Sequence, residues 1–118
     1  MSGHRAAHDM ANAPLDMVDP GASGTISIDR YGAIVEMVSA GVETRTLNNP
    51  TRSGVRATVR LKTAGGNVTV SASNGLNVAG NTAAVFGDVG DQLDMVSVSH
   101  TTGYRWEILT NTGSVGLS

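Results

Sequence analysis

Two histidines near the start of the chain are the first residues whose spacing could support chemistry. His4 and His8 are four residues apart, and Asp9 follows directly. On a helix, side chains at this spacing share one face and could hold a metal ion together. However, no fourth ligand stands nearby, and Pro14 and a Pro-Gly-rich stretch at residues 20–24 interrupt the segment. We therefore assign both histidines to a solvated N-terminal arm and predict no metal site.

Three aspartates form the second candidate group. Asp88, Asp91 and Asp94 lie in a glycine-containing segment, residues 87–94, which resembles an oxygen-rich calcium loop. The spacing and the terminal glutamate of an EF-hand loop are missing. The pattern instead predicts a tight turn in which an aspartate accepts hydrogen bonds from nearby backbone amides.

Nucleophilic catalysis has little support in the sequence. His100 is followed by Thr-Thr-Gly, which is typical of a turn, and no serine stands in a G-x-S-x-G motif. The chain contains no cysteine and therefore no thiol nucleophile. We predict no catalytic residue, no cofactor and no enzymatic activity.

Composition excludes further classes of partner. The 118 residues carry eight basic and ten acidic side chains, whereas a protein that binds nucleic acid needs a clustered positive surface. No apolar run approaches the roughly 20 residues of a membrane span, and the N-terminus lacks the apolar stretch of a cleaved leader. One domain that binds neither nucleic acid nor membrane is expected.

Period-two alternation dominates the chain from Thr25 onward and predicts short β-strands. It is clearest at residues 55–62 and 68–73, which we interpret as an antiparallel hairpin around the turn at residues 64–67. Trp106 is expected in the core, because it offers the largest apolar surface. The predicted fold is all-β, a small antiparallel β-sandwich or barrel over residues 25–118 with a flexible N-terminal arm, residues 1–24. Further strands are predicted at residues 25–28, 32–39, 42–47, 83–86, 92–99, 104–110 and 115–117.

Two segments, residues 32–38 and 92–99, carry apolar residues in both parities. Either a β-bulge shifts the register, or both faces of these strands are buried. On the second interpretation the excess apolar side chains bury a surface between subunits. The residues predicted for a homotrimer interface are Ile34, Val35, Met37, Val96 and Val98.

A family resemblance covers residues 43–118. It consists of Glu-Thr-Arg-Thr-Leu at 43–47, Gly-Asn-Val-Thr-Val at 66–70, Gly-Asp-Val-Gly-Asp at 87–91 and Tyr-Arg-Trp-Glu-Ile-Leu at 104–109, with a glycine-containing ending at 111–118. This order resembles small β-rich virion proteins of tailed bacteriophages. The resemblance implies a non-enzymatic capsid decoration, or cement, protein. Such a protein would bind the major capsid protein on the outer surface of the assembled capsid as a homotrimer, after synthesis in the host cytoplasm.

The same resemblance leaves a second function open, that of a tail-fibre or baseplate-associated β domain that binds a receptor or carbohydrate. We favour decoration, since a short arm followed by one β domain lacks the long shaft of a fibre. The expected capsid contacts in the arm are its apolar residues, Met10, Leu15, Met17 and Val18.

Overall fold

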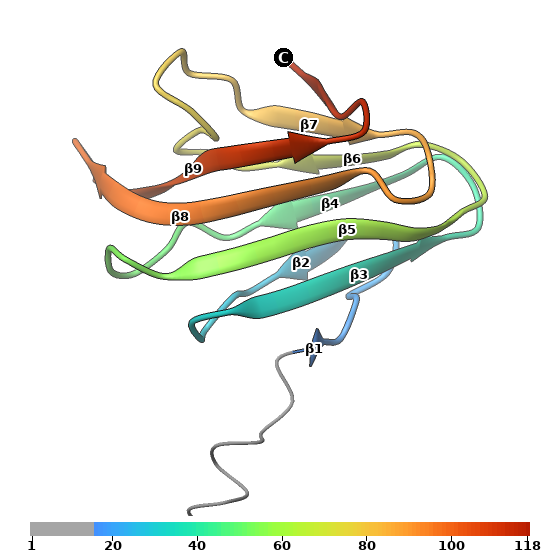
Figure 1. Cartoon of the computed structure of the whole chain (residues 1–118), viewed down its shortest axis with the longest axis horizontal. Helices are drawn as coiled ribbons and strands as arrows, with labels where there is room; N and C mark the ends of the chain where they lie inside the picture. Colours follow the sequence, from blue (N-terminus) through green and yellow to red (C-terminus); the bar gives the residue numbers. More distant parts are fainter. Residues whose placement is uncertain (1–15) are drawn as a thin grey trace, which may run out of the picture.

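The computed structural model of the protein describes residues 16–118, which form two β-sheets packed face to face (Figure 1). All regular structure in these residues is β, which confirms the predicted all-β, sandwich-like fold. Sheet A contains, in spatial order, β1 (Asp16–Met17), β3 (Ala33–Ser39), β5 (Arg56–Ala64), β8 (Gln92–His100) and β9 (Gly103–Thr112). Sheet B contains β10 (Gly116–Leu117), β7 (Ala83–Phe86), β6 (Val68–Ser71), β4 (Glu43–Leu47) and β2 (Gly24–Ile26).

The first six strands wind between the sheets as a flattened coil. Odd-numbered strands lie in sheet A and even-numbered strands in sheet B, and successive strands within each sheet run parallel. Only the last four strands add antiparallel pairs, among them the hairpin of β8 and β9. Both sheets are therefore mixed: the predicted antiparallel pairing is found for the last four strands, whereas the coiled strands pair in parallel.

The predicted hairpin of residues 55–62 and 68–73 is wrong, because β5 and β6 belong to opposite sheets. Residues 65–67 carry the chain across the sandwich directly beside the earlier crossing at residues 40–42, and Gly65 N donates to Ser39 O at 2.8 Å. A Cβ added to Gly65 would lie 2.6 Å from the Ala40 carbonyl carbon, and one added to Gly66 would lie 2.6 Å from Val42 N. Two consecutive glycines thus allow the crossings to stack.

Strict alternation holds in β3 and β8, where the sequence suggested a break. A serine occupies an inward position in each strand, and hydrogen bonds satisfy it. Ser39 Oγ donates to Gly66 O at 2.9 Å, and Ser97 Oγ accepts from Val55 N at 2.8 Å. The bulges lie in the partner strands instead. Lys62 of β5 is left unpaired in the register with β3, and Leu109 of β9 is left unpaired in the register with β8.

The core between the sheets is apolar and contains Trp106, as the sequence predicted. The indole Nε1 donates to Asn48 O at 2.8 Å, so that the polar atom of this buried side chain is satisfied. Val59 and Val70 belong to the same buried cluster, and Ile108 packs against it.

A buried arginine joins the first turn of the coil to the second. Arg45, on β4, has a fully buried side chain and binds Asp19 in the β1–β2 connection with two parallel hydrogen bonds, Nε to Oδ1 at 2.7 Å and Nη2 to Oδ2 at 3.0 Å. Its Nη1 donates to Glu43 Oε1 at 3.0 Å, and Nη2 also donates to Val38 O at 3.0 Å. Asp19 in turn accepts from Val38 N at 2.8 Å.

Residues 16–24 are therefore part of the sandwich, although the sequence assigned them to the arm. They supply β1, the Asp19 carboxylate and the start of β2. Strand β1 lies before the predicted boundary at Thr25 and pairs with β3.

We expect Trp106→Ala to lower the free energy of unfolding by roughly 3–5 kcal/mol, because it removes a buried aromatic and leaves a cavity. Urea unfolding followed by circular dichroism measures the change. Trp106→Phe serves as the control, since it keeps most of the packing and loses only the hydrogen bond to Asn48 O. A Trp106→Ala variant as stable as the wild type would contradict the core position.

Acid should destabilise the protein through Asp19. Burial by itself raises the pKa of Asp19, but hydrogen bonds from the Arg45 side chain and the amides of Val38 and Gly21, with the charge of Arg45, outweigh it and lower the pKa below 3.8. The folded state then binds fewer protons than the unfolded state around and below pH ~4, so the stabilisation is present above that pH and is lost as pH falls. Thermal melts from pH 7 to pH 2 should show this loss. Asp19→Asn should reduce the acid dependence and lower stability at pH 7.

Candidate functional site

The outer face of sheet A is formed by the side chains of its long strands that point away from the core. Cross-strand pairing places Ile34, Thr58, Asp94 and Thr110 in one row across β3, β5, β8 and β9. The neighbouring row runs from Arg56 through Val96 to Glu107. Polar, charged and apolar side chains thus alternate over this face.

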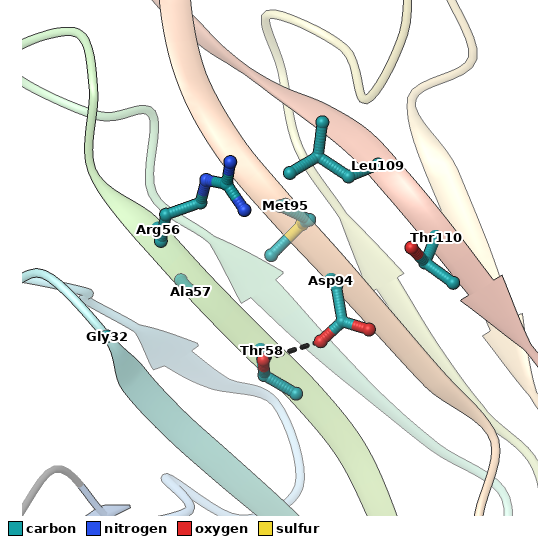
Figure 2. Close-up of a pocket in the computed structure, with 8 residues that line it drawn as sticks. All are labelled: Gly32, Arg56, Ala57, Thr58, Asp94, Met95, Leu109 and Thr110. Carbon is teal, nitrogen blue, oxygen red and sulfur yellow. Dashed lines mark hydrogen bonds between the residues drawn. The ribbon is translucent and has the colours of Figure 1, made fainter.

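A pocket of about 280 Å³ lies in this face, over β5, β8 and β9 (Figure 2). Figure 2 shows Arg56 on one side of it, the Thr58–Asp94 pair in its middle and two β9 residues on the far side. The lining residues are Gly32, Arg56, Ala57, Thr58, Asp94, Met95, Leu109 and Thr110.

The bulge in β9 shapes the far wall of this pocket. Asp94 pairs with Thr110 and Met95 pairs with Ile108, so Leu109 is the additional residue. A bulge re-aims side chains and bends the strand. Leu109 is consequently 47% exposed and contributes an apolar group to the pocket.

Asp94 is held by neutral hydrogen-bond donors. Thr58 Oγ1 donates to its Oδ1 at 2.7 Å, and Gln92 Nε2 donates to Oδ1 at 3.1 Å and to Oδ2 at 3.2 Å. Among residues 16–118, no cationic side chain forms a salt bridge with Asp94. The carboxylate therefore has a fixed position and an uncompensated negative charge.

Arg56 is the positive group of the pocket. It is exposed, and none of the described carboxylates lies within salt-bridge distance of it. The next outward arginine on the same strand differs, because Arg60 Nη1 contacts Glu36 Oε2 at 3.3 Å. The pocket thus presents one positive and one negative group that do not pair with each other.

One residue that lines the pocket has an exposed aromatic residue as its neighbour in the sequence. Tyr31 is 64% exposed and directly precedes Gly32, which lines the pocket. An aromatic side chain at such a position offers an apolar surface with a polar tip. Together these groups can bind a small polar molecule.

The residues predicted for a homotrimer interface separate into two groups. Val35 and Met37 are fully buried in the core of the protomer, which corrects the prediction for these two residues. Their parity on β3 points them toward sheet B. Ile34, Val96 and Val98 lie on the outer face of sheet A and are half-buried.

The residues predicted for capsid contact also separate. Met17 packs against the core of its own protomer, so its side chain is largely engaged there. Val18 is 92% exposed beside β1. Met10 and Leu15 lie outside the residues that the structure describes, as do His4 and His8.

The aspartate-rich segment forms a turn, as the sequence predicted. The buried carboxylate of Asp91 accepts hydrogen bonds from the backbone amides of Gly87, Asp88 and Ser114, at 3.0, 3.1 and 3.2 Å. Burial by itself raises the pKa of Asp91, but these backbone hydrogen bonds lower it below 3.8. In residues 16–118, no group of three or more His, Asp or Glu side chains could hold a metal ion.

Sequence reasoning missed the pocket, although the alternation at residues 55–62 puts Arg56 and Thr58 on the face opposite the apolar residues of that strand. The sequence pattern groups Asp94 with Asp88 and Asp91. Its outward position opposite Thr58 follows only from the pairing of β5 and β8. Tyr31 carried a usable signal, because an aromatic residue directly before a glycine and outside the alternating pattern is a candidate for exposure.

Comparison with known proteins adds no further identification. No protein-family model matches the chain, and no curated protein is significantly similar to it in sequence. In the part of the chain that the structure describes, no helix is long and apolar enough to cross a membrane.

Proposed function

We propose that the protein is a bacteriophage capsid decoration protein that binds the outer surface of the assembled capsid as a homotrimer and stabilises it. The observation that carries this proposal is an apolar strip on the outer face of sheet A, which consists of Val96 and Val98 on β8 and, on the other side of β5, Ile34 on β3. Exposed apolar surface that is rimmed by polar residues marks sites where proteins associate. The sequence resemblance to phage virion proteins supports the same assignment.

Stabilisation of the capsid would follow from mass action. A protein that binds the assembled lattice and not its separate subunits shifts the equilibrium toward the lattice. A trimer multiplies this effect, because attachment through one subunit raises the effective concentration of the other two at their sites. The proposed capsid contacts are Met10, Leu15 and the exposed Val18.

A second candidate function, the binding of a receptor or carbohydrate by a tail-fibre or baseplate-associated domain, is favoured by the pocket itself. Arg56 and Asp94, which form no ion pair within residues 16–118, suit a polar ligand. Val96 pairs with Arg56 and Ile34 pairs with Thr58, so the apolar strip borders the pocket. A trimer formed through the strip would cover the pocket. The decoration function therefore requires this face to be buried, whereas ligand binding requires it to be open to solvent.

Val96→Asp should dissociate the trimer, because the new carboxylate would lose its water at the interface without gaining a partner. We expect light scattering to give the mass of a trimer for the wild type and of a monomer for the variant, with the same circular dichroism spectrum. Val42→Asp is the matched control, since Val42 is 86% exposed in the β3–β4 turn, away from the strip. A Val96→Asp variant that remains trimeric would exclude the strip as the interface.

Loss of the apolar arm residues should weaken capsid binding and leave the fold intact. In the full chain, Met10→Ser, Leu15→Ser and Val18→Ser combined should reduce co-sedimentation with capsids about tenfold or more, because three apolar anchors are lost per subunit. Val78→Ser provides the control, as Val78 is equally exposed in the loop before β7. Equal binding by the triple variant and the wild type would rule out the arm as the contact.

A further inference from the structure

We propose that the pocket on the outer face of sheet A binds a monosaccharide that carries a carboxylate, that is, a sugar acid. The inference rests on the second candidate function and names its class of ligand. It does not depend on capsid binding.

The two charged groups of the pocket specify the ends of the ligand. Arg56 has a planar guanidinium with no described carboxylate partner, and such a group binds a carboxylate with two parallel hydrogen bonds. Asp94, which lies beside Thr58 on the neighbouring strand, bears the opposite charge (Figure 2). A ligand that fits both must offer an anion at one end and hydrogen-bond donors at the other.

Hydroxyl groups fit the Asp94 end better than a second cation does. Oδ1 of Asp94 already accepts from Thr58 and Gln92, whereas Oδ2 accepts only from Gln92, at 3.2 Å. One acceptor position on Oδ2 is therefore open, and Thr110 brings a hydroxyl to the same wall. Adjacent hydroxyls of a sugar ring can donate to Asp94 and exchange hydrogen bonds with Thr110.

The size and the apolar groups of the pocket match a single sugar ring. Its volume of about 280 Å³ lies just below the roughly 300–1,000 Å³ of pockets for drug-sized ligands. Leu109, which is 47% exposed, offers apolar surface for the C–H groups of a ring. An acidic side chain of a protein partner would bring a carboxylate to Arg56 but no donors for Asp94, which would repel it.

Titration of the purified full-length protein with sodium glucuronate tests this inference. In two-dimensional NMR, we expect shifts at the backbone amides of Arg56, Thr58, Asp94 and Thr110, with saturation at millimolar ligand. Glucose supplies the ring without the carboxylate, acetate the carboxylate without the ring, and glycine a carboxylate with an ammonium group. Each of the three should bind about tenfold more weakly than glucuronate or not at all.

Substitutions locate the binding groups. Arg56→Gln should weaken glucuronate binding about tenfold or more, because it removes a charge-assisted pair, and Asp94→Asn should weaken binding while leaving the Thr58 contact possible. Lys62→Gln is the matched control: it lies on the same strand, is exposed, removes the same charge and does not line the pocket. Its affinity for glucuronate should equal that of the wild type.

Three results would overturn the inference: no saturable shift with glucuronate, equal binding of acetate or glycine, or equal loss of affinity in Lys62→Gln and Arg56→Gln. Light scattering on the same samples gives the oligomeric state, and so tests the decoration proposal separately from the sugar-acid site. A trimer that binds no glucuronate refutes the sugar-acid site alone, whereas a monomer that binds glucuronate refutes the trimer alone.

Discussion

The contact between Arg45 and Asp19 is the interaction on which the coiled half of the fold depends. A guanidinium in a protein interior has lost its water, and its removal from solvent is favourable only when charged and polar partners replace that water. Asp19, Glu43 and Val38 O supply these partners from three separate places along the chain. Loss of the Asp19 carboxylate would leave a buried cation without the partner that binds it with two hydrogen bonds. Because Asp19 follows β1 directly after Val18, this contact also holds the two-residue strand β1 at the edge of sheet A.

The same contact closes the edge of sheet A. Strand β1 pairs with only two residues of β3. Farther along β3, the Asp19 carboxylate accepts a hydrogen bond from the backbone amide of Val38. A side chain thus replaces part of a neighbouring strand. Directly after Val38, Gly65 and Gly66 let two chain crossings stack at backbone distance. These constraints fix the register of β3 against β5, and hence the rows of side chains on the outer face.

That outer face combines two features that are seldom compatible. Ile34 and Val96 give it apolar surface, while Arg56 and Asp94 give it charges that pair with no charged side chain in the described part of the chain. Apolar surface is stabilised by contact with another protein, but an unpaired charge loses free energy when such a contact removes its water. A partner that covers the strip must therefore either leave the pocket open or supply groups that satisfy Arg56 and Asp94. This requirement links the two candidate functions physically.

The sequence by itself determined most of the strands, the inward residues of β5 and β6 and the core position of Trp106, because alternation and apolar size act locally along the chain. Alternation could not distinguish a hairpin from a crossing between sheets. In both arrangements Val59 and Val70 point into one core, and only the pairing partners differ. It also could not show that Arg45, at an inward position, is buried with Asp19, 26 residues earlier. The pocket arises only when β5 pairs with β8 and brings Thr58 beside Asp94, 36 residues apart in the chain. Tertiary structure decided these features, because contacts between distant segments depend on which strands become neighbours, and no local pattern encodes that choice.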